Sequence, residues 1–442
     1  MLDREQLQAL CALALAESKA DQTEVVALSG ETALTRYANN AIHQNVAEDN
    51  LSLSVRAVQG RRQGVASTND PGPDALRHTV RQAVRLASLA PETPGFPGLP
   101  SAPPPAPGPE PSPATLTTTP EARAQAVAQV LEVAARDSLT AFGALSTEHS
   151  LLTVANSHGV LAQGEFTRAS LSVVMQAEGS FGRAEAHSAD VAALDAPALA
   201  QTAADKARGG RDPRALPPGR YTVVLEPLAV ADLLMWLGFY GFNAQMYQEG
   251  RSFLSEKLGQ AVADARINLW DDGLDPRGLP QPFDFEGVPK QRVPLIENGV
   301  AVGMVHDSRT AAAASPPGVS TGHALPAPNS WGPVPTNLFL APGDSDPQDL
   351  LRSTDRGVLV TRFHYTNMVH PVQTVLTGMT RDGTFLLEGG EVVGGVKNLR
   401  FTQSLLETLA QVELIGNAGT QFEYAWVPAL KVGGFNFTGA TD

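Results

Sequence analysis

The stretch of residues 209–219 constrains the fold of this chain more than any other sequence feature. It is rich in the residues that end helices and strands, namely Gly209, Gly210, Pro217, Pro218 and Gly219. Helical and strand patterns alternate twice before this stretch, and strands with glycine turns dominate after it. A chain of 442 residues also exceeds what one hydrophobic core usually serves. We therefore predict two domains, residues 1–218 and 219–442.

The first domain shows both helical and strand periodicity in its apolar residues. Helical spacing of apolar residues covers 3–19, 74–89, 120–137 and 195–208. Alternation of apolar and polar residues predicts strands at 24–28, 51–58, 150–156, 160–163 and 168–177. A turn signal at Asn39 and Asn40 indicates a hairpin around residues 35–45. We expect an N-terminal domain of the α/β type, built of helices and small sheets.

The second domain is predicted to be mostly β with a few helices. Apolar runs at 293–297, 300–305, 336–340, 357–361, 372–377, 384–388 and 391–393 indicate strands joined by short turns. Helical patterns cover 227–247 and about 402–412. The predicted fold class of the whole chain is therefore α+β.

Residues 91–120 contain twelve prolines and show neither helical nor strand periodicity. Such a composition is typical of a linker or a long extended surface loop, partly of polyproline character. Because the segment has few large apolar residues to bury, we expect it to be mobile and dispensable for folding.

Charge and composition exclude several functions. The net charge is −14, which argues against sequence-independent nucleic-acid binding, since that needs a basic face. Acidic residues precede any apolar stretch at the N-terminus, so no signal peptide is predicted. The most apolar stretch, 223–242, contains Glu226 and Asp232, so a membrane span is rejected. The single cysteine, Cys11, lies in an apolar helical pattern and is expected to be buried. We expect a cytoplasmic protein.

An ordered series of short motifs runs along the chain. The series comprises TRYANN at 35–40, GRRQG at 60–64, NSHGV at 156–160, EGRSF at 249–253, FDFEGVP at 283–289, LIENGV at 295–300, DSRTA at 307–311, PTNL at 335–338 and TRDGTF at 380–385. In this order and spacing, the chain resembles the TldD/PmbA family over nearly its whole length, apart from the proline-rich segment. Taken singly, residues 284–287 indicate a turn with solvated acids, 297–299 a hairpin and 381–384 a strand–turn–strand.

The resemblance implies a metal site that this sequence lacks. Catalytic members of the TldD type carry His-Glu-x-x-x-His on a helix and a later cysteine, a set that holds zinc and supplies a general base. Here Met235 and Tyr240 occupy the histidine positions, and Trp236 replaces the glutamate. Residues 220–260 contain no histidine, and no cysteine follows Cys11. We expect no metal or other cofactor in this chain.

Other candidate residues carry weaker signals. The resemblance makes Asn243, Arg251 and Ser252 candidates for a peptide cleft or for family-motif positions. His364 and His370 are six residues apart, which on a strand separates them by about 20 Å. Like His306 and His323, they are interpreted as ordinary polar or interface histidines. No Gly-x-Ser-x-Gly motif and no phosphate-binding loop occurs.

The chain is most similar to the TldE (PmbA) side of the family, whose members pair with a zinc-bearing TldD subunit. The resemblance implies a peptidase complex that cleaves unfolded or modified peptides, including microcin precursors. We predict a non-catalytic subunit that pairs with a zinc-bearing TldD-like partner, or with itself, and helps to hold an extended peptide. The β-rich C-terminal domain is expected to supply a sheet edge to which such a peptide adds as a strand. Two alternatives remain: a homodimeric binding or scaffold protein, and an independent hydrolase with unrecognised chemistry.

Overall fold

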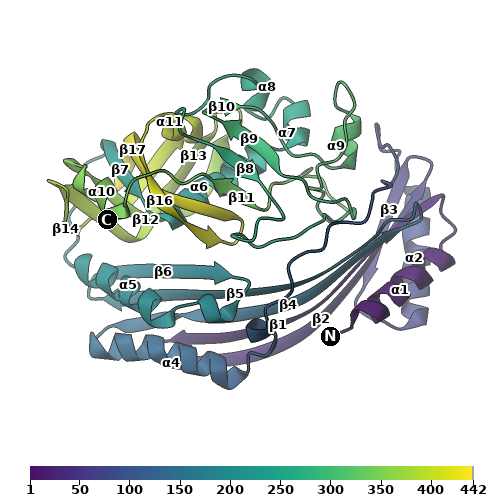
Figure 1. Cartoon of the computed structure of the whole chain (residues 1–442), viewed down its shortest axis with the longest axis horizontal. Helices are drawn as coiled ribbons and strands as arrows, with labels where there is room; N and C mark the ends of the chain where they lie inside the picture. The colour runs from purple at the N-terminus through teal and green to yellow at the C-terminus, as the bar shows by residue number, and fades with distance from the viewer. Residues whose placement is uncertain (441–442) are drawn as a thin grey trace.

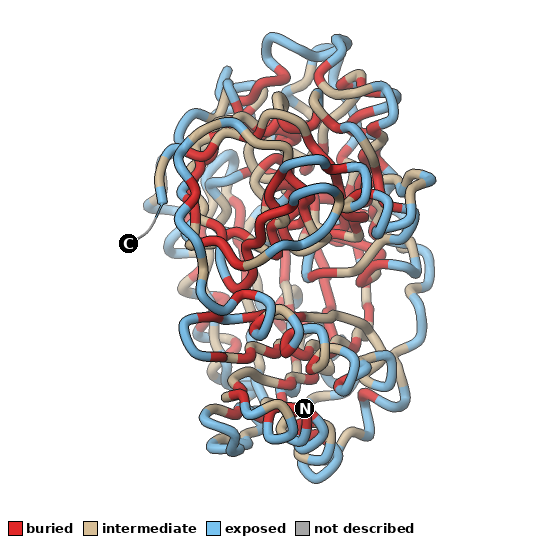
Figure 2. Tube along the Cα trace, turned by 90° about the vertical axis from the view of Figure 1, so that its left-hand side faces the viewer, coloured by how far each residue is buried: buried red, intermediate tan, exposed pale blue. Residues whose placement is uncertain are grey.

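The computed structural model describes residues 1–440. A long curved sheet forms the N-terminal part, with helices on one face and the C-terminal domain on the other (Figure 1). Buried segments are most concentrated in the C-terminal domain, in the upper part of Figure 2. The predicted α+β class is confirmed.

The N-terminal sheet is fully antiparallel, with the strand order β3-β2-β1-β4-β5-β6. Its strands are β1 (Gln22–Ala38), β2 (Ala41–Gln59), β3 (Arg62–Thr68), β4 (Thr140–Asn156), β5 (Leu161–Ala177) and β6 (Ser180–Ser188). The helices of this part are α1 (Arg4–Glu17), α2 (Pro73–Leu89), α3 (Pro113–Leu116), α4 (Pro120–Arg136) and α5 (Ala196–Gly209). The predicted strands are therefore pieces of much longer ones, and one large sheet replaces the small sheets that we expected.

The predicted hairpin at residues 35–45 is present as the turn between β1 and β2. Asn39 and Asn40 have φ values of 51° and 60°, as a turn of the type I′ requires. The side chain of Asn40 also links this turn to β4, because its Oδ1 accepts the Ala141 N–H at 2.6 Å. Helix α4 begins as predicted, with Thr119 as its N-cap and Pro120 in the first turn.

Five strands of the C-terminal domain close into a ring. β7 pairs with β12, β12 with β13, β13 with β15, β15 with β17, and β17 returns to β7. The strands of this domain are β7 (Gly219–Leu225), β8 (Leu269–Asp271), β9 (Val293–Glu297), β10 (Val300–Ala301), β11 (Leu338–Leu340), β12 (Arg356–His370), β13 (Val375–Glu388), β14 (Glu391–Gly395), β15 (Leu399–Ser404), β16 (Val412–Phe422) and β17 (Ala425–Ala440). Its helices are α6 (Pro227–Gly241), α7 (Ala244–Gln248), α8 (Leu254–Lys257), α9 (Ser308–Ala312), α10 (Pro347–Arg352) and α11 (Leu405–Ala410).

Aromatic side chains fill part of the ring. Phe363, Phe401, Phe435 and Phe437 are buried, and neighbouring rings in this group have centroids 4.6–5.7 Å apart. Such contacts supply both a large buried area and a preferred ring geometry. Helix α6 packs against β12 and β17, so the ring positions this helix.

Two sequence-based assignments in the C-terminal domain are wrong. Residues 381–384 do not form a turn between strands but a bulge inside β13, where Asp382 and Gly383 have φ values of 54° and 131°. The helix predicted at 227–247 is divided into α6 and α7, because Asn243 starts a new helix as its N-cap. No helix among the described residues is long and apolar enough to cross a membrane.

The proline-rich segment is held against both domains rather than hanging free. Leu99 is 5% exposed, and its N–H donates to Gln22 Oε1 at 2.7 Å. Asn156 Nδ2 donates to the Pro100 carbonyl at 2.8 Å. Residues 97–103 also line a cavity of about 400 Å³ together with Val288 and Pro289 of the C-terminal domain. Of the two alternatives, the structure favours the long extended surface loop over a free linker: residues 91–112, which we call the strap, contact both domains and lead into α3. That this segment is dispensable for folding stays a prediction.

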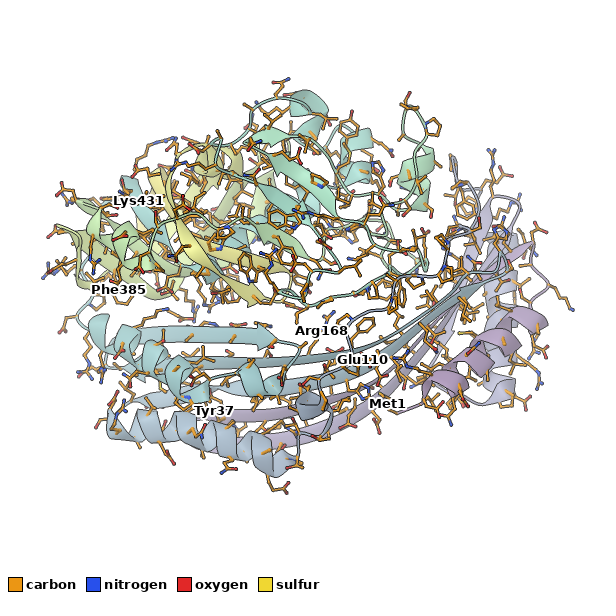
Figure 3. The ribbon with its side chains drawn as sticks, in the orientation of Figure 1. Met1, Tyr37, Glu110, Arg168, Phe385 and Lys431 are labelled. Carbon is orange, nitrogen blue, oxygen red and sulfur yellow. The ribbon has the colours of Figure 1, made fainter. Side chains whose placement is uncertain are left out.

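The two domains meet through a small apolar cluster on the inner face of the sheet. Phe283 of the C-terminal domain is fully buried there against Leu152, Val154 and Ala162. Figure 3 shows side chains between the sheet and the C-terminal domain, with Arg168 of β5 at this boundary. Residues more than one hundred positions apart in the sequence, such as Leu152 and Phe283, therefore meet at this boundary.

Candidate functional site

Helix α6 carries the positions where the resemblance implies metal ligands. Trp236 and Tyr240 are four residues apart and therefore neighbours on one face of the helix. Their rings stack, with centroids 5.9 Å apart and an interplanar angle of 16°. Trp236 Nε1 donates to Thr366 Oγ1 on β12 at 2.9 Å, which fixes the indole against the ring of strands. Met235, the third position, is 39% exposed.

Further aromatic residues extend this face. Phe239 contacts Tyr240 at 5.3 Å between ring centroids and Trp331 at 5.1 Å. Trp331 comes from the loop before β11 and is 47% exposed. We call Met235, Trp236, Phe239, Tyr240 and Trp331 the aromatic surface of α6.

The chemistry of these side chains does not fit a zinc ion. Zinc in proteins is held by thiolates, imidazoles and carboxylates, whereas an indole N–H can only donate. The one acid on α6 is Asp232, whose Oδ2 already accepts the Phe363 N–H at 2.9 Å. Burial raises the pKa of Asp232 to about 6. Within residues 1–440, no three His, Cys, Asp or Glu side chains come together as a metal-binding group.

The three candidate cleft residues have local roles in the structure. Asn243 is fully buried, where its Oδ1 caps α7 and its Nδ2 donates to the Trp331 carbonyl at 2.8 Å. Ser252 is also fully buried, and its hydroxyl donates to the Gly241 carbonyl at 2.5 Å. Arg251 is half exposed and pairs with Glu249 at 2.9 Å. Asn243 thus supports the aromatic surface of α6 through the backbone of Trp331.

The histidines do not form a common site. His364 and His370 both lie on β12, a strand that extends well beyond the predicted 357–361. His323 is fully buried and its Nε2 contacts Asp271 Oδ1 at 2.8 Å. Burial lowers the pKa of His323, although the charge of Asp271 opposes this shift. Sequence reasoning missed this buried pair, because Asp271 lies more than fifty residues away and carries no local motif.

The motif at 283–289 forms a tight turn, but its acids are not solvated as we expected. Asp284 is 1% exposed and Glu286 is 8% exposed. Asp284 accepts the backbone N–H groups of Glu286, Val288 and Ala324, each at 2.9 Å. Burial, and then the charge of Glu286, raises the pKa of Asp284 to about 8 even though these three N–H groups favour its anion. The interpretation as a surface turn is corrected, because the turn is enclosed between the domains.

Glu286 completes a buried ionic group that joins the two domains. Arg56 Nη2 on β2 lies 2.6 Å from Glu24 Oε2 on β1 and 3.4 Å from Glu286 Oε1. Glu286 Oε2 also accepts the Ser308 N–H at the start of α9 at 3.1 Å. Burial raises the pKa of Glu24, whereas Arg56 opposes that shift. We call Glu24, Arg56 and Glu286 the buried ionic triad.

The triad borders a pocket of about 570 Å³ between the two domains. One wall is formed by Gln63, Gly64 and Val65 of β3 and by the end of α2. The opposite wall includes Gln245, Arg309 and residues 324–329. Arg309 Nη2 donates to Gln245 Oε1 at 2.7 Å. This interdomain pocket was not predicted from the sequence, because its walls come from motifs more than two hundred residues apart.

The fold and the order of the motifs define a protein of the PmbA/TldA metallopeptidase class. The model of the metallopeptidase C-terminal domain matches residues 218–439, that of domain 1 matches 23–87 and that of the central domain matches 110–210. The chain belongs to the PmbA/TldD family, as its motifs predicted. Domain 1 and the central domain together build the single six-stranded sheet.

Individual relatives agree with this assignment. The metalloprotease PmbA of Escherichia coli is 24% identical over 445 residues, which cover 96% of this chain and 94% of that protein. A metalloprotease TldD homolog of Buchnera aphidicola is 27% identical over 205 residues, which cover 46% of this chain but only 41% of the relative. The crystal structure of TldE from Thermococcus kodakarensis covers 98% of this chain and all of its own, with a TM-score of 0.87 at 21% identity. This last likeness shows a shared fold.

Proposed function

We propose that this chain is a non-catalytic, TldE-like subunit of a cytoplasmic metallopeptidase complex that acts on unfolded or modified peptides. The zinc would be held by a TldD-like partner subunit. One observation carries the proposal: Met235, Trp236 and Tyr240 stand on α6 where the family resemblance implies the ligands and the base, and their side chains cannot replace imidazole or carboxylate. The surrounding family framework is kept, which supports a role in assembly or peptide binding.

The aromatic surface of α6 is the natural candidate for contact with the partner or the peptide. It exposes Met235 and Trp331, and aromatic side chains supply large contact area where they become buried at interfaces. Asn243 and Thr366 hold its members in place through the hydrogen bonds described above. The position that carries metal chemistry in catalytic members therefore offers apolar contact in this chain.

A reconstitution experiment tests the proposal. Cleavage of an internally quenched, unstructured peptide is measured with this chain alone, with a zinc-bearing TldD-like protein alone and with the mixture, each with and without chelator. We expect the mixture to be more active than either component, and chelator to abolish that activity. Chelator-resistant cleavage by this chain alone would instead identify an independent hydrolase. No gain on mixing, with no complex on a sizing column, would identify a homodimeric scaffold.

Substitution of Trp331 by alanine tests the surface itself. We expect Trp331→Ala to lower the activity of the mixture about tenfold or more, because aromatic contacts at the centre of an interface often contribute ~2 kcal/mol. Leu258→Ala is the matched control, since Leu258 is similarly exposed at 40% but lies after α8. Equal effects of the two substitutions on activity would contradict this assignment of the surface.

A further inference from the structure

We propose that the outer edge of β3 binds an extended peptide as an additional strand beside the interdomain pocket. β3 (Arg62–Thr68) is the terminal strand of the six-stranded sheet and pairs only with β2 within the ordered sheet of the described residues. An edge strand offers backbone donors and acceptors that recognise another backbone without requiring a particular sequence. The inference locates where the peptide of the proposed function binds. It rests on that function only for the claim that the peptide is a substrate of the complex.

The register of the hairpin identifies the free backbone groups. Gln59 and Arg62 flank a two-residue turn, and Gly60 in that turn has a φ of 60°. In such a hairpin the flanking pair is hydrogen-bonded, and bonded and non-bonded pairs then alternate along the ladder. Gly64 and Ala66 therefore bond to β2, whereas the N–H and C=O groups of Val65 and Ser67 point away from it.

The chain itself already uses the first part of this edge. Arg62 forms an antiparallel bridge with Glu92, and the Thr93 N–H donates to the Arg61 carbonyl at 2.9 Å. The strap thus pairs with the first residues of β3. Residues 65–68 of β3 lie beyond this pairing. A peptide that continued in the same antiparallel sense would lie in line with the strap.

Three other edges are partly covered or short. β6 (Ser180–Ser188) contacts β13 and β16 of the C-terminal domain. β16 is bonded on its outer side by residues 343–345, where the Gly343 N–H donates to the Gly416 carbonyl at 2.9 Å. β10, at the end of the C-terminal sheet path, is only two residues long. Residues 361–370 of β12 also lack a paired strand on one side. We assign the peptide to β3 in the N-terminal sheet, rather than to the C-terminal domain that the sequence suggested, because the strap already pairs with this edge and the interdomain pocket lies beside it.

The interdomain pocket supplies room for side chains of the added strand. Gln63 and Val65 of β3 line it on one side, and Arg309 and Gln245 line it on the other. Arg56, 9% exposed, also lines the pocket, and its Nε has no hydrogen-bond partner among the described residues. Backbone pairing at β3 and room for side chains in the adjacent pocket together define the site.

Fluorescence anisotropy with defined peptides tests the site on the chain alone. The probe is a fluorescein-labelled heptapeptide of alternating threonine and valine. Two further versions carry N-methyl groups, one on every threonine and the other on every valine. We expect one methylated version to bind about tenfold or more weakly, because its methyl groups face β3, and the other to bind within about threefold of the parent. Equal binding of both, or equal loss of both, would overturn one-sided backbone pairing.

A proline substitution tests the same edge from the protein side. Ser67 is exposed, and Ser67→Pro removes an outward N–H without removing a bond to β2. We expect it to weaken binding of the unmethylated peptide about threefold to tenfold, while Ser67→Ala, which keeps the N–H, has no effect. Unchanged binding by a folded Ser67→Pro variant would contradict the proposal. If that variant fails to fold, binding of the two methylated peptides to the native chain still tests the proposal. Failure of activity to rise on mixing with a partner leaves this binding result intact, so the two proposals can fail separately.

Discussion

Arg56 forms the buried ion pair that joins the two domains. Its guanidinium lies between Glu24 of the same sheet and Glu286 of the other domain, and both carboxylates are largely buried. Two buried anions near one cation leave this group with excess negative charge when all three are ionised. Raising the pKa of Glu24 relieves part of that excess, and burial acts in this direction.

Removal of Arg56 should therefore be strongly destabilising. Arg56→Met leaves two buried carboxylates without their cation, and we expect the free energy of unfolding to fall by about 3–5 kcal/mol in urea denaturation. Adding Glu24→Gln should restore part of that loss. Arg251→Met removes an ion pair whose arginine is 51% exposed and should cost no more than about 1 kcal/mol. A small effect of Arg56→Met would mean that water reaches the triad.

Asp284 should give the protein a measurable dependence of stability on pH. Its pKa rises from 3.8 to about 8 in the folded state, so the folded protein holds a proton that the unfolded chain releases. This contribution is fully present below about pH 4 and is lost as the pH rises to about 8, by at most ~1.4 kcal/mol per pH unit. Stability measured in urea between pH 5 and pH 8 should fall more steeply for the native chain than for Asp284→Asn. The exposed Asp344→Asn should follow the native chain, and parallel curves for all three proteins would contradict the prediction.

At the scale of elements, substitution of Leu99, the one deeply buried apolar residue of the strap, tests whether the strap is held in place. Leu99→Ser removes apolar contact and places a hydroxyl at a site that is 5% exposed. We expect the free energy of local opening to fall by about 2 kcal/mol, which makes cleavage within the strap roughly thirtyfold faster in limited proteolysis. Pro104→Ser, at an exposed strap position, should leave the cleavage rate unchanged. Rapid cleavage of the native strap would restore the original expectation of a mobile linker.

Helix and hairpin positions could be predicted because their signals are local. Thr119 and Pro120 start α4, and Asn39 and Asn40 turn β1 into β2, as the sequence indicated. Strand lengths could not be predicted as well, because residues near the middle of β1 and β2 are exposed and interrupt the alternation. Asp382 carries a turn signal, yet the long-range pairing of β12 with β13 absorbs it as a bulge.

The candidate site, like the fold, could be predicted from the sequence only where its signals are local. Residue types on α6 could be read directly, so the absence of imidazole and thiolate side chains on this helix, with Met235, Trp236 and Tyr240 among its residues, was accessible from the sequence. The interdomain pocket was not, because Arg56 and Glu286 are 230 residues apart and meet only when the sheet docks on the other domain. The buried state of Asp284 was missed for the same reason.

At the scale of the whole molecule, metal content is the most direct test of the chain's place in its family. We expect the purified chain to contain well below one zinc per molecule by elemental analysis, since α6 offers no thiolate or imidazole. A zinc-bearing family member prepared in the same way is the positive control. One tightly bound zinc per chain, lost when residues of α6 are substituted, would contradict the prediction.

Closure of the five-stranded ring affects how the protein is made. β7 is synthesised first, and its antiparallel partner β17 follows only after residues 226–424 have been translated. At the usual translation rate of about 5–20 residues per second, the edge of β7 that pairs with β17 stays unpaired for roughly 10–40 s. During this time the nascent domain exposes a strand that other chains can pair with, and chaperone binding would protect it. A premature stop before β17 would therefore not merely shorten the domain but leave the five-stranded ring open, with an unpaired edge on β7.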